Sequence, residues 1–363
     1  MYLARSARPR LLSQARLCRA ASAPSYAAAP RTLSTITTTP FPPTLATPNS
    51  STALQTTTLE RPAISRKPAL DSRTQQRSHA YNVSDQVGSK RFRDFDLEGG
   101  VYIVTGGGRG LGLCMAEALA EAGGKVYCLD RLEQPVPDFF EACARIPTAF
   151  GGTLSYARVD VRDARSLDRV VGAIADQHER LDGVVAAAGV QQLKAAVDYT
   201  LDEVREMMDV NYSGVFMTCA SAARAMFRWN PGRRDGAMVL IASMSGSVAN
   251  KGLVCPVYNS SKAALLQLTR NLAMEWSGKG REHVSGLGGI RVNSLSPGHI
   301  LTPMVKRNFE EVPGLREKWE RENMMGRLAT PEEFKGAGLF LLSKASSFMT
   351  GSNLIIDGGH TAW

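Results

Sequence analysis

A glycine-rich turn between a buried strand and a helix constrains this chain more than any other feature. The apolar run 101–105 leads into TGGGRGLG at 105–112, and 111–121 has the pattern of a helix. Glycines let the backbone turn tightly and approach a pyrophosphate, while the helix amino terminus supplies N–H groups and a partial positive charge. We therefore predict a dinucleotide-binding turn, with cofactor contacts from Gly106, Arg109, Gly110, Leu111 and Gly112.

Strand and helix patterns then alternate to the end of the chain. Nearly continuous apolar strands separated by helices are typical of a parallel sheet with helices on both faces. We therefore predict one α/β domain at 97–363, a Rossmann-type doubly wound parallel sheet. The predicted strands are 101–105, 125–129, 154–159, 183–187, 237–242, 290–295 and 353–356, and the predicted helices are 111–121, 166–178, 201–228, 256–276 and 331–342.

The first 96 residues have a different composition. Residues 1–40 contain six arginines and no lysine or acid, and 1–80 hold eleven basic and two acidic side chains, which account for the whole net charge of +9. An acid-free, arginine-rich start is typical of a mitochondrial presequence, although a merely disordered tail has a similar composition. We assign 1–34 to a presequence and 35–96 to a disordered or irregular linker. The expected location is the mitochondrial matrix, or alternatively the cytoplasm.

Composition also limits the partners that we expect. Residues 81–363 hold 32 basic and 32 acidic side chains, so this part lacks the basic excess of a nucleic-acid-binding protein. No apolar stretch approaches the roughly 18 residues of a membrane-spanning helix. The cysteines and histidines show no zinc spacing. We therefore expect no nucleic acid, no membrane insertion and no metal.

Two carboxylates end predicted strands on the side where a dinucleotide would lie. Asp130 follows the second strand, where it can accept hydrogen bonds from the adenosine ribose and repel a 2′-phosphate. Asp160 ends the third strand and suits the adenine amino group. Both carboxylates could instead cap a neighbouring helix. The sequence therefore favours NAD as the cofactor, with NADP as the alternative.

Four polar residues have the chemistry of a proton-transfer site. Tyr258 and Lys262 are four apart near the start of a predicted helix, so they share one face. A phenol with a pKa near ~10 is a poor base at neutral pH, and a neighbouring ammonium is expected to lower that pKa. Ser243 ends the fifth strand, where its hydroxyl can polarise a substrate oxygen. Asn211 lies within the predicted helix 201–228.

These motifs together resemble the short-chain dehydrogenase/reductase family over 97–363. The glycine octet matches the family pattern T-G-x-x-x-G-x-G, and 258–262 matches Y-x-x-x-K. Residues 241–246 match I-S-S-x-x-G, 209–214 are similar to N-V-x-G, and 293–302 match N-x-x-x-P-G-x-x-x-T. The resemblance implies an NAD(P)-dependent enzyme that interconverts a secondary alcohol and a ketone.

The resemblance also implies roles for individual residues. Tyr258 would be the general acid and base, Lys262 would lower its pKa and hold the nicotinamide ribose, and Ser243 would orient the reacting oxygen. Asn211 would hold a water in a proton relay to Lys262. Further cofactor contacts are implied for Gly189, Pro297 and Gly298, and for the Ile300 backbone and Thr302, which would bind the nicotinamide carboxamide, in addition to Tyr258 and Lys262. Family resemblance further suggests a homotetramer formed through the long helices 201–228 and 256–276.

Two departures from the family pattern narrow the resemblance. The usual N-N-A-G reads AAAG at 186–189, and the serine–tyrosine spacing is fifteen instead of thirteen, which makes Ser245 a competitor of Ser243. Both features resemble fungal polyol dehydrogenases and ketose reductases, the group of D-arabinitol 2-dehydrogenase, mannitol 2-dehydrogenase and sorbose reductase. Arg109 and Arg131 resemble the basic residues of NADP-preferring members.

Oxidation of a polyol at C2 to a 2-ketose is therefore the leading functional hypothesis, with a small polyol or ketose as the partner. Gln191, Gln192 and Lys194 follow the fourth strand and could bind substrate hydroxyls. The alternatives are a 3-oxoacyl thioester (acyl-carrier-protein) reductase and, from another class, a non-catalytic scaffold or RNA-binding subunit.

A mobile lid is expected at 301–325, after the Pro297–Gly298 turn. We expect its apolar residues to cover the nicotinamide and exclude water. These residues are Met304, Val305, Phe309, Trp319 and Met324.

Overall fold

The computed structural model describes residues 92–229, 236–251, 253–277 and 289–363. The predictions for 1–34 and for most of 35–96 lie outside these residues. Within them, no helix is both long and apolar enough to cross a membrane.

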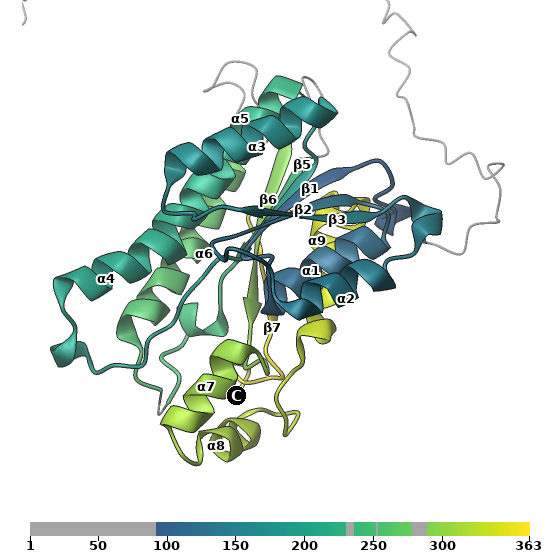
Figure 1. Ribbon diagram of the computed structural model, residues 1–363. Coiled ribbons are helices and arrows are strands. Elements are labelled where there is room, and N and C mark those ends of the chain that lie inside the picture. Colours follow the sequence, from purple (N-terminus) through teal and green to yellow (C-terminus); the bar gives the residue numbers. More distant parts are fainter. Residues whose placement is uncertain (1–91, 230–235, 252, 278–288) are drawn as a thin grey trace, which may run out of the picture. The chain divides into compact units, whose positions relative to one another are not determined.

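A seven-stranded parallel sheet forms the centre of the domain, as predicted (Figure 1). All neighbouring pairs are parallel, and the strand order is β3-β2-β1-β4-β5-β6-β7. The order reverses between β1 and β4, and this reversal defines a doubly wound sheet with a ligand crevice beyond the carboxyl ends of its strands. The strands are β1 (Val101–Thr105), β2 (Lys125–Asp130), β3 (Thr153–Arg158), β4 (Gly183–Ala186), β5 (Gly236–Ile241), β6 (Ile290–Pro297) and β7 (Asn353–Ile356).

Helices cover both faces of this sheet. One face carries α1 (Gly110–Glu121), α2 (Pro137–Arg145) and α9 (Lys335–Leu342), and the other carries α3 (Ala164–His178), α5 (Val215–Trp229) and α6 (Pro256–Trp276). Two short helices, α7 (Pro303–Glu311) and α8 (Leu315–Glu322), follow β6 and lie at the lower end of Figure 1.

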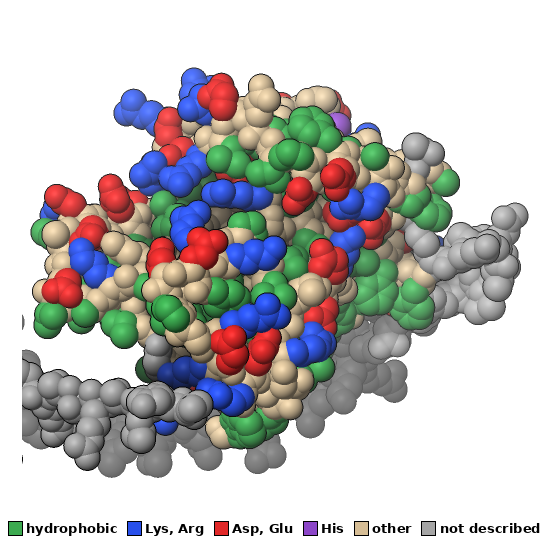
Figure 2. Space-filling model, turned by 60° about the horizontal axis from the view of Figure 1, so that its bottom comes forward, with side chains coloured by type: hydrophobic (Ala, Val, Ile, Leu, Met, Phe, Trp, Pro, Cys, Tyr) green, Lys and Arg blue, Asp and Glu red, His purple; other side chains and the backbone are tan. Residues whose placement is uncertain are grey.

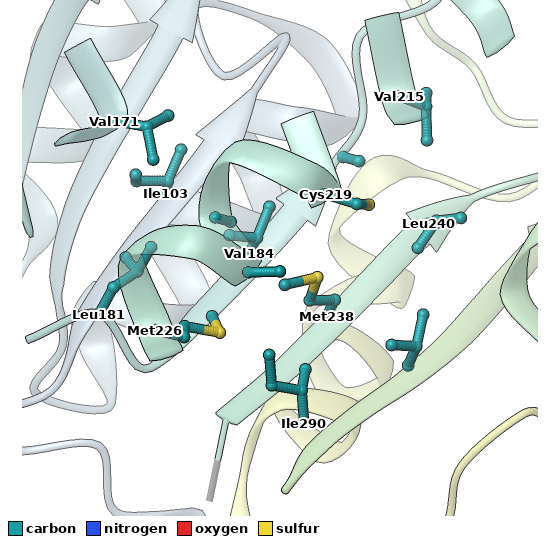
Figure 3. Close-up of a cluster of buried hydrophobic side chains, with 14 of the residues drawn as sticks. Ile103, Val171, Leu181, Val184, Val215, Cys219, Met226, Met238, Leu240 and Ile290 are labelled. Carbon is teal, nitrogen blue, oxygen red and sulfur yellow. The ribbon is translucent and has the colours of Figure 1, made fainter. Parts of the chain in front are cut away.

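The strands are apolar on both sides because each side faces a helix layer. Val101 and Ile103 of β1 pack with α3, α5 and α6, whereas Tyr102 and Val104 pack with α1 and α9. Successive side chains of a strand point to opposite faces, so one short run contributes to two cores. Figure 3 shows the first of these cores, where Ile103, Val184, Met238 and Leu240 of the sheet lie beside Val171, Cys219 and Met226 of the helices.

The structure corrects the predicted helix 201–228. It consists of α4 (Leu201–Met208), a π-helical turn (Asp209–Gly214) and α5 (Val215–Trp229). A π turn inserts one extra residue per turn, and such insertions are common at functional sites. Helices α2, α7 and α8 were missed because they are short and their sequences lack a long apolar stripe. The predicted helix 331–342 begins as a 3₁₀ turn (Pro331–Phe334) that continues into α9.

Candidate active site

A cleft of roughly 530 Å³ opens where the strands end. It lies at the crevice that a doubly wound parallel sheet offers to ligands. The structure brings together all the predicted cofactor residues in its lining, although they come from segments spread over two hundred residues. These are Gly106, Arg109, Gly110, Leu111, Gly112, Asp130, Asp160, Gly189, Tyr258, Lys262, Pro297, Gly298, Ile300 and Thr302.

The glycine turn has the geometry that a pyrophosphate requires. Gly110 has a φ of +57°, and a Cβ at this position would have no neighbour within 4 Å, so the backbone faces open space. A Cβ at Gly112 would collide with the carbonyl oxygen of Gly106. Arg109, the N-cap of α1, makes no side-chain capping bond, which leaves first-turn N–H groups for an anion. These observations fit a dinucleotide phosphate.

Asp130 is buried next to this turn. Its carboxylate accepts hydrogen bonds from the backbone N–H groups of Gly108 at 3.2 Å and Leu132 at 3.3 Å. These bonds fix the carboxylate at the end of β2, while exposed Arg109 and Arg131 line the same part of the cleft. Next to the glycine turn, a fixed carboxylate therefore lies in the same part of the cleft as two exposed cations.

Asp160 lines the cleft, but it already has a partner. The Arg162 guanidinium donates to both of its oxygens, with a shortest N–O distance of 2.6 Å, and lowers the pKa of Asp160. Because the amide of Arg162 also donates to this carboxylate, part of its accepting capacity is used within the chain. An adenine amino group would have to share the carboxylate with Arg162.

Ser243, Tyr258 and Lys262 meet in the middle of the cleft. Ser243 follows β5, and its hydroxyl faces the Tyr258 phenol closely enough to lower the pKa of that phenol. Tyr258 and Lys262 lie on one face of the first turns of α6, and the Lys262 Nζ is 5.7 Å from the centre of the Tyr258 ring. The buried ammonium donates to the carbonyl of Ile241 at 2.7 Å. A hydroxyl, a phenol and an amine therefore line one ligand space.

The ionisation of Tyr258 differs from the expectation. Burial raises the pKa of its phenol to about 12, although the hydrogen bond with Ser243 lowers it. Burial also lowers the pKa of Lys262 to about 8. Desolvation disfavours both charged forms, so the pKa of Tyr258 is raised, whereas the sequence analysis expected it to be lowered.

The structure also separates the two candidate serines. The backbone N–H of Ser245 donates to Ser243 Oγ at 3.2 Å, and Ser245 Oγ accepts from the Asn250 amide at 2.5 Å. Both serines line the cleft, but only Ser243 acts on the pKa of Tyr258, whereas the Ser245 hydroxyl is bonded to Asn250. The geometry therefore favours Ser243 over Ser245 for holding the reacting oxygen.

Asn211 lies just behind the cleft, within the π turn. Its side chain accepts from the Val190 N–H at 2.8 Å and donates to the Val190 carbonyl at 2.9 Å and to Ser261 Oγ at 3.0 Å. A Cβ at Gly189 would lie 3.5 Å from both Asn211 Oδ1 and Lys262 Nζ, which places these two groups on the same side of the strand end. Asn211 therefore holds the backbone beside Lys262.

Of the three polar residues predicted to bind substrate after β4, one lines the cleft and two bond to α4. Gln191 lines the cleft, and its Oε1 accepts from the Asn308 amide of α7 at 3.0 Å. Gln192 and Lys194 instead bond to Glu203 of α4, at 3.0 and 2.7 Å, so the expected hydroxyl contacts from these two are wrong for this structure. Of the three, Gln191 alone lines the cleft.

Only some of the expected lid residues line the cleft. Met304, Val305 and Trp319 line the cleft. Phe309 packs against Trp319 with ring centres 5.5 Å apart, and Met324 is half exposed; neither belongs to the cleft lining. The sequence analysis missed Leu253, His299 and Arg307, which also line it. The position of His299 inside the Pro–Gly motif was an available signal.

Comparison with known proteins agrees with this geometry. Residues 106–361 match a family described as Enoyl-(Acyl carrier protein) reductase. Galactitol 2-dehydrogenase from Rhizobium johnstonii is 38% identical over 74% of this chain and 98% of its own length. D-arabinitol 2-dehydrogenase [ribulose-forming] from Candida albicans is 33% identical over 74% of this chain and 95% of its own.

A solved structure of the same fold also resembles this chain over most of the domain. The crystal structure of a short-chain type dehydrogenase/reductase from Mycobacterium marinum is 34% identical, covers 74% of this chain and 98% of its own, and superimposes with a TM-score of 0.65. Residues 106–361, which match the family, contain the glycines of the turn and the Ser243, Tyr258 and Lys262 cluster. This chain therefore belongs to the short-chain dehydrogenase/reductase family and is an NAD(P)-dependent oxidoreductase.

Proposed function

We propose that the protein oxidises the C2 hydroxyl of a five- or six-carbon polyol to a 2-ketose, with D-arabinitol or a close relative as substrate. The observation that carries this proposal is the similarity to two polyol 2-dehydrogenases over nearly their whole length. Gln191, in the cleft lining, supports it because its amide has hydrogen-bonding capacity beyond the bond to Asn308.

The residues of the cleft account for such a reaction. Ser243 donates a hydrogen bond to the reacting oxygen, and Tyr258 takes the hydroxyl proton during oxidation or returns it during reduction. Lys262 supplies a positive charge that favours the phenolate. The nicotinamide supplies the hydride acceptor when it is bound. The lid residues Val305 and Trp319 exclude water from this space.

A substrate panel tests the proposal directly. Protein lacking residues 1–80 is assayed with pentitols, hexitols, the matching 2-ketoses and 3-oxoacyl thioesters, each with NAD(H) and NADP(H). We expect turnover of at least one polyol and of its 2-ketose. Turnover of thioesters without turnover of any polyol would refute the polyol assignment and leave the family assignment intact.

A 3-oxoacyl thioester reductase is the second candidate, and one observation favours it. Leu253, Trp319 and Val305 form an apolar wall that also contacts Tyr258, and such a wall suits an acyl chain. A carrier-protein substrate would also need a basic docking surface. Figure 2 shows basic and acidic side chains intermixed over the face turned forward, the end that carries α7 and α8. We therefore rank this candidate below the polyol reaction.

NAD is the cofactor that we propose. The Asp130 carboxylate is held by two backbone N–H groups, so it cannot swing away from a 2′-phosphate. Arg109 and Arg131 are exposed and can move into solvent. A fixed anion should therefore outweigh two mobile cations at this end of the cleft.

A mitochondrial location and a homotetramer are also proposed. The location rests on the acid-free, arginine-rich segment 1–40, and deletion of 1–80 should abolish import of a tagged protein without changing its kcat. The tetramer rests on exposed apolar side chains of α4, α5 and α6, among them Leu201, Phe216 and Met274. Light scattering of the purified protein would show four chains per particle, and a monomer would refute the tetramer.

A further inference from the structure

The carboxyl-terminal turn of the chain reaches the nicotinamide end of the cleft through a group of aromatic rings. His299, between the predicted cofactor residues Gly298 and Ile300, stacks on Trp319 of α8 with ring centres 3.7 Å apart and planes 6° from parallel. His360 meets His299 edge-on, with ring centres 5.2 Å apart. Three segments, around residues 299, 319 and 360, therefore meet at one imidazole.

Polar atoms at this junction are buried without a hydrogen-bond partner in the described part of the chain. They are His299 Nε2, His360 Nδ1 and Asn323 Oδ1. Buried polar atoms in native proteins are normally hydrogen-bonded, and leaving one unpaired costs about 1–3 kcal/mol. Burial lowers the pKa of His299 to about 3, so its imidazole is neutral and has one donor and one acceptor. The two rings lie edge to face with centres 5.2 Å apart, so rotation of one ring can bring these two nitrogens into an N–H···N hydrogen bond.

Backbone bonds hold the carboxyl-terminal turn against the same junction. The Gly298 N–H donates to the Ile356 carbonyl at 2.9 Å, and the Met325 N–H donates to the Gly358 carbonyl at 3.1 Å. Within the turn, the Asp357 carboxylate accepts from the N–H groups of Gly359 and Thr361 and from the Thr361 hydroxyl. The ring of His360 therefore projects from a turn that is itself fixed.

We propose that His360 is a positioning residue for the nicotinamide half of the cofactor site, acting through a hydrogen bond that its unpaired Nδ1 forms with the unpaired Nε2 of His299 when one of the two rings turns toward the other. That bond orients the His299 ring against Trp319 and so fixes the loop 297–302, which carries the predicted contacts to the carboxamide. The adenosine half of the site, built by the glycine turn and Asp130, does not depend on it. The inference rests on the cofactor site and holds for either candidate substrate.

Binding of two ligands to the same protein separates this role from a general loss of structure. NADH carries the nicotinamide, whereas ADP-ribose contains only the remainder of the molecule. We expect His360→Leu to weaken NADH binding roughly two- to tenfold, as measured by fluorescence titration, and to leave ADP-ribose binding unchanged by calorimetry. His360→Asn, which keeps an amide atom near the position of Nδ1, should restore most of the NADH affinity.

A matched control removes a histidine elsewhere. His178 also contacts an aromatic ring, and its Nε2 lies 2.7 Å from the Tyr127 hydroxyl, but it lies at the end of α3 outside the cleft lining. His178→Leu should change neither affinity. A double-mutant cycle of His299→Leu with His360→Leu should give less than the sum of the two single effects.

Three results would overturn the proposal. One is an equal loss of NADH and ADP-ribose affinity in His360→Leu, which would indicate a structural role. The second is an unchanged NADH affinity in this variant. The third is full additivity with His299→Leu, which would show that the two imidazoles act independently. Each affinity is measured on folded protein, so a lower Tm in a variant does not decide the outcome.

Discussion

The cofactor half of the cleft, which here means the part that binds the pyrophosphate and the adenosine, is assembled mainly from one stretch of the chain. The substrate half, which includes the nicotinamide contacts, draws on segments far apart in the sequence. Residues 101–131 supply β1, the glycine turn, α1 and Asp130. The substrate half needs Gln191 after β4, Ser243 after β5, Tyr258 on α6 and the lid after β6. In the cofactor half, the local conformation of the backbone forms the binding site. In the substrate half, the site forms only when distant segments pack together.

This difference has a chemical consequence. Backbone N–H groups and a strand-end carboxylate bind the same part of any dinucleotide, so the cofactor half is suited to one ligand class. In the substrate half, polar Gln191 and His299 lie beside apolar Leu253 and Val305. The two halves should therefore respond differently to substitution, and the following predictions test that separation.

The largest expected effect is on Tyr258. Tyr258→Phe removes the proton carrier and leaves the glycine turn untouched, so kcat should fall by about 10²–10⁴. The Kd for NADH, measured by fluorescence, should stay within about threefold of the wild type. Turnover within tenfold of the wild type would contradict the assignment. An equal loss of cofactor binding would show that the halves are not separable.

The two serines provide a matched pair inside the substrate half. Ser243→Ala should lower kcat by about 10²–10³, because it removes a donor aimed at the reacting oxygen. Ser245→Ala should have a smaller effect, below about tenfold, because the Ser245 hydroxyl is bonded to Asn250 and not to Tyr258. Steady-state kinetics on the same substrate decide between them. A reversed order would assign the catalytic role to Ser245.

Asp130 tests the cofactor half alone. Asp130→Ser should raise kcat/KM with NADPH relative to NADH by about tenfold, because it removes a fixed negative charge from the ribose end. Arg131→Ala should change the ratio in the opposite direction and by less. For each variant, kcat/KM is measured for NADPH and for NADH at a saturating concentration of the same ketone substrate, and the two values are compared. A wild type that already prefers NADPH would overturn our choice of NAD.

The smallest expected effect is the change that Lys262→Met makes to the pH dependence of oxidation. Burial raises the pKa of Tyr258 to about 12, and oxidation needs the phenolate, so kcat/KM for alcohol oxidation should rise from pH 6 to pH 9. Reduction needs the protonated phenol and should not show this rise. Lys262 carries its charge only below its pKa of about 8, so Lys262→Met should lower kcat/KM for oxidation by less than about tenfold below pH 8 and leave it nearly unchanged at pH 9. An unchanged profile in this variant would show that Lys262 does not act on Tyr258.

Much of the cofactor half was predictable because its signals are short in the sequence. The octet 105–112 fixes a strand, a turn and a helix within one segment, and the structure places all of its predicted contacts in one cleft. The strand order could be predicted only as a class, doubly wound and parallel. The π turn at Asp209–Gly214 was not predictable, because its residues fit an ordinary helix equally well.

The substrate half shows the limits of the same reasoning. Three polar residues after β4 appeared equivalent, yet Glu203 of α4 binds Gln192 and Lys194 and leaves Gln191 at the cleft. The sign of the Tyr258 pKa shift was also missed, because burial is a property of the folded environment and not of the Tyr258–Lys262 spacing.

The sequence alone determined the fold class, the dinucleotide turn and the identity of the Ser243, Tyr258 and Lys262 cluster. These features depend on local backbone chemistry and on residue spacing along single elements. The tertiary structure decided which of two serines contacts Tyr258, which glutamine lines the cleft and how His360 reaches His299. These relations depend on side chains that approach from distant segments, and only packing brings such side chains together.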